Sequence, residues 1–494
     1  MRLPLLVSRL LQNYPLLGLV VCAVAAMGFN FPRLTGGQFN WIESHHIAAA
    51  LLEGRGFSDP FNGQTGPTAW VPPVFVWIAA AIFAVAGIKT PLAAAVLLGL
   101  TVIGHAAVHA VLVACIDPAA RRMRRLVSCL YLSAVVLMPN GPFQLASENW
   151  LQVLLPVTLV WAALAHRRNP DRKAGLTLAA LAIVGPLAHA GFAVALALTL
   201  LGMFFFDLRE RRSWAIALRP VMAALLTVLT IGAWTVRNTM ALDRVIPLKS
   251  NFWFEMHLAN VASANGLPRT EEVLREMPFF NTAQFNRYAT LGEVAYVDSF
   301  REPTIAALEA DPGAFRRKVM RRAMNAFVYL DSSSGSEITA LTFTAMDQRR
   351  IAATGMLQPV DGSRFSYWHR IDLPPTEAWA TLNALHLDDF EGVWSDWSAR
   401  HLKHMEAHYS ALALALGFAF AGLPTLAWFG LLLAGRGKLP PIAGWATLGI
   451  VGLLLPYVLI NHSARHQGPL LGLQVIIVAA CINAWCDRWG AASH

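Results

Sequence analysis

The chain has 494 residues, of which 56% are hydrophobic and 14% are charged, and its mean hydropathy is +0.47. This composition excludes an ordinary soluble protein, in which about 25% of residues are charged. The net charge of +9 would suggest nucleic acid in a soluble protein, but in a membrane protein anionic lipids are the simpler partner. No nucleic acid partner is therefore expected. The five cysteines lie in or beside apolar runs, so no disulfide framework is expected either.

Apolar runs long enough to cross a bilayer, about 20 residues each, recur along the chain. They predict an all-α polytopic membrane protein with about ten transmembrane helices. The predicted spans are residues 14–31, 93–116, 125–139, 149–166, 174–188, 189–206, 214–235, 409–433, 440–460 and 468–486. The first run lacks a clean small-residue cleavage site, which favours a retained helix over a signal peptide.

Positive charge is concentrated in short loops at alternate ends of these runs. The loop residues are Arg121, Arg122, Arg124 and Arg125; Arg167, Arg168, Arg172 and Lys173; Arg209, Arg211, Arg212 and Arg219; and Arg436 and Lys438. The intervening loops at 139–147 and 186–190 carry no Lys or Arg. Because cytoplasmic loops hold the excess of Lys and Arg, this alternation predicts the orientation of the whole chain.

Two stretches do not fit a transmembrane span. Residues 71–87 are apolar but short and begin near a Pro-Pro pair, and a span there would invert every later basic loop up to Arg219. We therefore expect a first outer loop at residues 32–92 that carries two surface helices. Residues 236–408 are polar and contain helical pieces, which predicts a mainly helical outer cap. The predicted organisation is thus a membrane module at 1–235, the cap at 236–408 and C-terminal helices at 409–494.

The predicted orientation gathers several ionisable residues on the outer side, where a functional site is expected. In the stretch NWIESHHIAAALLEGRGF, Asn40 and Glu43 are one helical turn apart. One interpretation is a capping pair, with Asn40 as N-cap and Glu43 reaching back to its amide. The other is that Glu43 is a general base held at the membrane surface.

Other outer-side residues allow the same two kinds of interpretation. Glu148 opens a membrane helix, where the helix dipole favours an acid, but an acid so close to lipid also suggests function. His189 lies in a short turn and is either solvated or functional. Arg465 and His466 interrupt the outer end of the last helix pair, where Arg can bind a phosphate or a lipid headgroup.

Metal and nucleotide motifs are weak in this sequence. His401, His404 and His408 repeat at helical spacing near Glu406, which fits a metal site or, more simply, a solvated helix before the membrane. Trp394 and Trp397 are typical of an interfacial aromatic belt. The sequence has no Walker loop, no GxGxxG after a strand, no HExxH and no zinc-spaced cysteine pair.

Several motifs taken together resemble those of GT-C membrane glycosyltransferases. The similarity is to family 39-like bacterial enzymes related to protein O-mannosyltransferases and aminoarabinose transferases. The motifs occur in the family's order and are LLEGRGFSDPF with PTAWVPPVF, ASENWLQVLLP, LAHAGF, WTVRNTMALDRVIPLKSNFWFEMHLAN and INHSARHQGPLLGLQVIIVAA. Two positions depart from the family. Asn40 stands where the family usually has Asp, and Val71 stands where it often has Lys or Arg.

The resemblance implies a GT-C fold in the bacterial inner membrane, with the site facing the periplasm. It implies an inverting transfer of sugar from a polyprenyl-phosphate donor to a hydroxyl of a glycan, glycolipid or protein. Glu43 and Glu148 are then the expected catalytic residues, with Glu43 as base and Glu148 orienting the acceptor or holding a divalent ion such as Mg²⁺ or Mn²⁺. The candidates for binding the donor phosphate are Arg465, His466, His189, Arg237 and Arg55. Asn40, His46 and Asn251 are expected to position the acceptor.

Two other functions remain open. A transporter or flippase would be expected to have ionisable groups in mid-span and an internal repeat, and the sequence has neither. A non-catalytic glycan-binding or assembly protein on the same scaffold agrees with the replacement of functional residue types at Asn40 and Val71.

Overall fold

A computed structural model describes the chain over several stretches. They are residues 13–35, 41–137, 148–268, 272–273, 276–278, 281–328, 418–419, 421–462 and 464–492. Within these stretches the chain is helical and forms no strand. The predicted all-α fold is therefore confirmed for the described residues.

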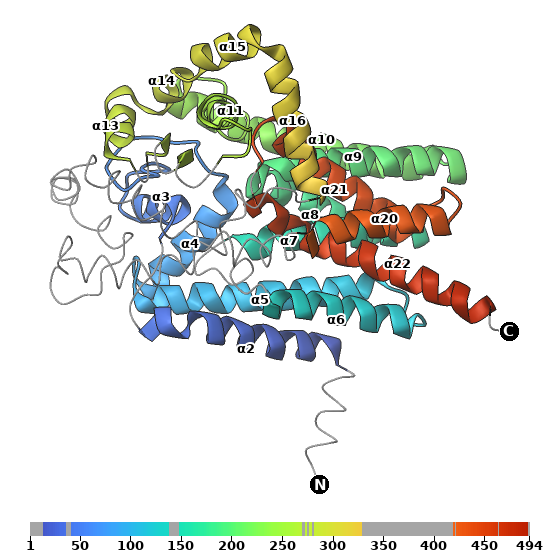
Figure 1. Ribbon diagram of the computed structural model, residues 1–494. Helices are drawn as coiled ribbons and strands as arrows, with labels where there is room; N and C mark the ends of the chain where they lie inside the picture. Colours follow the sequence, from blue (N-terminus) through green and yellow to red (C-terminus); the bar gives the residue numbers. More distant parts are fainter. Residues whose placement is uncertain are drawn as a thin grey trace, which may run out of the picture.

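A bundle of long helices forms the body of the molecule (Figure 1). Six helical segments in the described stretches are long and apolar enough to cross a bilayer. They are α5 (Pro91–Cys115), α7 (Asn149–Arg168), α9 (Ala190–Phe206) continued by η1 (Asp207–Arg211), α10 (Trp214–Leu242), α21 (Pro441–Leu459), and the end of η6 (Ala464–Leu470) with α22 (Leu471–Ala492). The chain thus has the helices of a membrane protein.

The other four predicted spans overlap four further helices. They are α2 (Tyr14–Thr35), α6 (Arg121–Leu137), α8 (Arg172–Ala188) and α20 (Gly422–Ala434). As described, α6 and α8 have 17 residues each and α20 has 13, and the apolar stretch of α2 is described over Tyr14–Gly28; each helix packs within the bundle. The total of ten spans therefore stays a prediction.

The basic loops meet at one end of the bundle, which we call the basic end. Arg168 donates to the Cys115 carbonyl at 3.3 Å, Arg211 donates to the His166 carbonyl at 3.0 Å, and Arg219 donates to the Pro170 carbonyl. The end of α22 lies at this end too (Figure 1). The grouping that charge alternation predicts is thus present in the fold, and the membrane side that it faces stays a prediction.

The opposite end, which we call the cap end, carries short helices. The first loop contributes α3 (Glu43–Leu52) and α4 (Pro73–Ala86), which pack on each other. Fourteen helical residues extend only about 21 Å, less than the roughly 30 Å of a hydrocarbon core. Two helices thus lie within residues 32–92, as predicted, and α4 is too short to span; their place on the outer membrane surface stays a prediction.

The described part of the cap is helical, as predicted. It contains α11 (Phe252–His257), η2 (Leu258–Ala262), α13 (Thr282–Leu291), α14 (Glu293–Asp298), α15 (Arg301–Ala310) and α16 (Pro312–Val328). Aromatic residues of the first loop, Phe61 and Trp70, pack in one cluster with Phe254 and Tyr288 of the cap. The first loop and the described cap therefore share a core.

A buried carboxylate strengthens this junction. Glu293 accepts hydrogen bonds from the Thr68 hydroxyl, from the Ala69 amide at 2.6 Å and from the Tyr288 hydroxyl at 2.7 Å. Burial raises the pKa of Glu293, and these hydrogen bonds act in the opposite direction. The contacts fix the loop before the Pro-Pro pair against α14.

Candidate functional site

The two predicted catalytic acids come from distant segments that touch at the cap end. Glu43 is the first residue of α3, and Glu148 is the N-cap residue of α7. The Ser44 hydroxyl donates to Glu148 Oε2 at 3.4 Å, across 104 positions of sequence, and Gln152 donates to Glu148 Oε1 at 3.1 Å. The first turn of α3 therefore lies against the start of α7, and both acids are half-buried.

The capping interpretation, with Asn40 as N-cap and Glu43 reaching back, places the start of the helix two residues too early. The N-cap of α3 is Ile42, so Glu43 is the first helical residue rather than the third. The side chain that reaches back is His45, whose Nδ1 accepts from the Ile42 amide at 3.1 Å. Asn40 lies outside the described residues. Because His45 makes the capping contact, that role does not require Glu43.

A cation that could not be assigned from the sequence, Lys89 in the turn after α4, reaches α3 next to Glu43. Lys89 Nζ donates to His46 Nδ1 at 2.8 Å, and His46 is buried. Burial, followed by the charge of Lys89, lowers the pKa of both His45 and His46, which keeps the two imidazoles neutral at pH 7. His46, which we predicted to position the acceptor, thus contacts an ammonium group.

Lys89 could have been noticed in the sequence. It is the only Lys or Arg between residues 56 and 120, and it follows the apolar run at 71–87. Its proximity to His46 could not be noticed, since 43 residues separate the two and no local pattern links them.

Two predicted phosphate-binding arginines bond within the protein. Arg237 donates to the carbonyls of Thr68 at 2.8 Å and Phe57 at 2.9 Å, and it stacks over the Phe57 ring. Arg55 pairs with Glu53 and, at 2.8 Å, with Asp59. These contacts hold the first loop in shape and give both arginines a structural role.

His189 lies at the turn between α8 and α9, as the sequence predicts, and it is buried. Its Nε2 is 2.6 Å from the Tyr457 hydroxyl of α21, whose ring stacks on His466 with centroids 3.8 Å apart. Burial, with a smaller effect of Lys249, lowers the pKa of His189 to about 4. His189 is therefore a neutral hydrogen-bonding group at pH 7, not a cation.

A second buried histidine, His462, extends this group. Gln467 Nε2 donates to the Ala326 carbonyl at 2.8 Å and lies 3.4 Å from His462 Nε2. Since the amide group is a donor, His462 Nε2 accepts and its Nδ1 carries the hydrogen. That Nδ1 is buried and has no partner among the described residues, as is also true of His189 Nδ1 and Asn461 Oδ1. Several buried polar atoms at the cap end thus lack partners within the described protein.

Arg322 adds positive charge close to His462, at the end of α21. It is fully buried and donates to the carbonyls of Val458 at 2.7 Å and Leu459 at 3.1 Å, at the end of α21. These carbonyls would otherwise lack helical partners. Its charge is a secondary cause, after burial, of the lowered pKa of His462, which is about 4.

The remaining predicted residues lie at the same end. Asn251 donates to Glu255 Oε1 at 3.2 Å, and Asn461 donates to Glu255 Oε2 at 2.6 Å, which links α11 to the end of α21. Arg465 lies in η6, next to His466, and its side chain is outside the described side chains.

The described residues contain no group of three or more His, Cys, Asp or Glu side chains that could hold a metal. Glu43 and Glu148 could supply carboxylate oxygens, which Mg²⁺ and Mn²⁺ prefer. His401, His404 and His408, with the nearby Trp394 and Trp397, lie outside the described residues.

Comparison with known proteins finds no matching family model, no matching curated protein and no matching solved structure.

Proposed function

We propose that the protein is a membrane glycosyltransferase that moves a sugar from a polyprenyl-phosphate donor to an acceptor hydroxyl at the cap end. The observation that supports this most is the contact between Ser44 and Glu148. It joins the start of α3, with Glu43, to the start of α7, at the end of the bundle away from the basic loops.

In the proposed reaction, Glu43 is the general base. Its carboxylate takes the proton from the acceptor hydroxyl as the oxygen attacks the anomeric carbon. The bond from that carbon to the phosphate oxygen breaks, the configuration inverts, and polyprenyl phosphate leaves with the bonding electrons. Glu148 orients the acceptor or contributes an oxygen ligand to a divalent ion.

The leaving phosphate needs positive charge and hydrogen-bond donors. Arg465 and His466 remain candidates for this role, and Lys89 is a further candidate because it contacts His46 on α3, the helix that begins with Glu43. His189 would contribute an N–H group rather than a charge, given its low pKa. The short helices of the cap would exclude water, which would otherwise hydrolyse the donor.

Substitution of Glu43 tests the proposal. Glu43→Gln keeps the size of the side chain and removes the base, so we expect transfer to fall by about 10²–10⁴-fold while folding and lipid binding stay close to wild type. The measurement is release of polyprenyl phosphate from a panel of polyprenyl-phosphate sugars by the purified full chain. Glu53→Gln is the matched control, because Glu53 is an exposed acid at the other end of α3.

Two results would contradict the assignment. Wild-type turnover in Glu43→Gln would remove Glu43 from the chemistry. Binding of a short-chain polyprenyl phosphate without turnover by the wild-type protein, for any donor of the panel, would favour a non-catalytic binding protein. The internal bonding of Arg55 and Arg237 is the observation that keeps this second function under consideration.

A further inference from the structure

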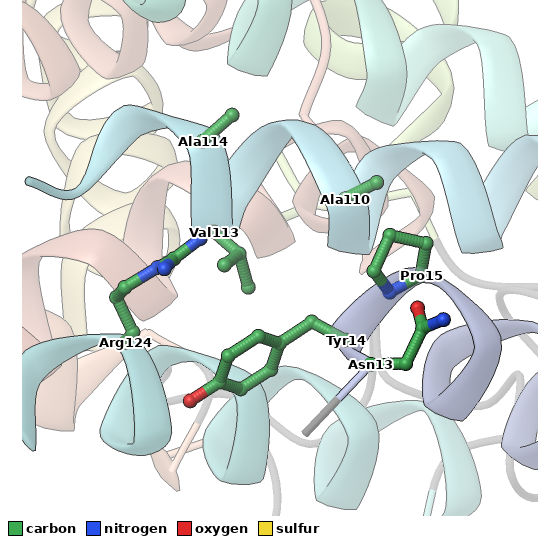
Figure 2. Close-up of a pocket in the computed structure, with 7 residues that line it drawn as sticks. All are labelled: Asn13, Tyr14, Pro15, Ala110, Val113, Ala114 and Arg124. Atoms are coloured by element: carbon green, nitrogen blue, oxygen red, sulfur yellow. The ribbon is translucent and has the colours of Figure 1, made fainter. Parts of the chain in front are cut away.

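A cavity lies at the basic end, on the opposite side of the bundle from Glu43 and Glu148. Its volume is about 550 Å³, and it opens between the starts of α2 and α6 and the end of α5 (Figure 2). The described residues that line it are Asn13, Tyr14, Pro15, Ala110, Val113, Ala114 and Arg124, and none of them is acidic.

Arg124 supplies the charge of the cavity. Its guanidinium lies 5.2 Å from the centre of the Tyr14 ring, and Figure 2 shows the ring reaching from α2 toward Arg124. The Nε atom of Arg124 is buried and has no hydrogen-bond partner among the described residues. A buried guanidinium N–H requires an acceptor, so this atom points to a ligand with oxygen acceptors.

The other features of the cavity fit a lipid. Ala110, Val113 and Ala114 give it an apolar wall on α5, and Tyr14 is of the type that lies at membrane interfaces. Asn13 Oδ1 accepts from the Leu16 amide at 3.2 Å, so its NH₂ group is the part that can donate to a ligand. A free phosphate would use the polar groups but not the apolar wall.

Nearby charge favours an anionic headgroup. Arg121, Arg122 and Arg125 precede or follow Arg124 on the first turns of α6 and are exposed. Such clusters attract anionic lipids, and the planar guanidinium suits two phosphate oxygens. We infer that this cavity binds one anionic phospholipid, with its phosphate on Arg124 and Tyr14 and an acyl chain along α5.

The test is native mass spectrometry of the purified full chain, titrated with phosphatidylglycerol or with phosphatidylcholine. We expect the wild type to retain one phosphatidylglycerol in preference to phosphatidylcholine. Arg124→Gln should weaken phosphatidylglycerol binding about tenfold, as loss of one charged two-point contact implies. Arg125→Gln, which removes the same charge from an exposed position outside the cavity, should weaken it far less.

A second variant tests the apolar wall without changing charge. Ala114 is exposed at the cavity, so Ala114→Phe should fill it and displace the lipid while the fold, checked by circular dichroism, is retained. Equal losses in Arg124→Gln and Arg125→Gln, or unchanged binding in Ala114→Phe, would overturn the inference. Displacement of the lipid by an excess of inorganic phosphate would identify a free-phosphate site instead.

Discussion

At the scale of single residues, burial sets the charge of polar side chains at the cap end. His189 lies in a turn, where a histidine is commonly solvated, yet its burial keeps the imidazole neutral at pH 7. Lys89 reaches His46 because the turn after α4 packs on α3, and no local sequence pattern indicates this contact. That Glu43 and Glu148 lie at the same end of the bundle follows instead from charge alternation, which the sequence shows.

Two buried histidines at the cap end predict a loss of stability in acid. The pKa of His189 and of His462 is about 4 in the folded protein, below the ordinary value of 6.5. The unfolded chain therefore binds more protons between pH 6.5 and 4, and stability falls as the pH drops through this window. Each histidine should cost on the order of 2 kcal/mol between pH 7 and 5.

The measurement is the melting temperature of the full chain in detergent at pH 7 and at pH 5. His462→Gln should melt with a smaller difference between the two values than the wild type, because Gln does not titrate. The lost bond to Gln467 lowers both melting temperatures alike and cancels in the difference. An unchanged difference in this variant, and in His189→Gln, would show that neither histidine is held neutral by burial.

At the scale of elements, the positions of long helices along the chain could be predicted better than the contacts between helices. The predicted 440–460 and 93–116 correspond closely to α21 and α5, since long apolar runs have one stable solution in lipid. That α4 is too short to span could be predicted from the short apolar run and its Pro-Pro start. How closely α21 approaches α9 could not be predicted, because a glycine in an apolar run does not indicate which helix it meets.

Gly452 permits the close approach of α21 to α9. A Cβ at this position would lie 2.8 Å from the backbone nitrogen of Ala195, and backbone cannot yield as a side chain can. Small residues commonly allow membrane helices to pack this closely. Gly452→Ala should therefore destabilise the protein by about 1–3 kcal/mol through overpacking.

Gly444 offers a matched control on the same helix. A Cβ there meets nothing within 4 Å, so Gly444→Ala should be neutral or stabilise the helix by up to about 1 kcal/mol. The measurement is thermal unfolding of both variants in the same detergent. Equal melting temperatures would mean that α9 and α21 move apart without cost.

At the scale of the whole molecule, the basic loops and the candidate site occupy opposite ends of the helix bundle. The basic loops converge on one end, and the contacts of Glu148, His189 and His466 lie at the other. Alternation of Lys and Arg along the chain was sufficient to predict this division, since it requires only helix count and loop order. The cap was predicted as helical, but its core with Phe61 and Trp70 was not, because aromatic pairing across 200 residues leaves no local pattern.

The orientation of this division in a membrane is the prediction on which the donor class depends. A cysteine at Gly87 would be a poor probe, because that residue has φ +88° and its Cβ would meet Thr90 at 2.7 Å. Ile88 is 40% exposed at the same turn, so Ile88→Cys, in a background without the native cysteines, should react with an impermeant maleimide on intact cells. Lys438→Cys, at the exposed basic end, should react only after permeabilisation.

The reverse labelling result would also change the class of sugar donor that we expect. If Lys438→Cys reacted on intact cells and Ile88→Cys did not, Glu43 and Glu148 would face the cytoplasm. Water-soluble nucleotide sugars would then reach the cap end, and the need for a lipid-linked donor would disappear. Glu43→Gln would still report on a general base, so the labelling experiment separates the identity of the donor from the assignment of the acid.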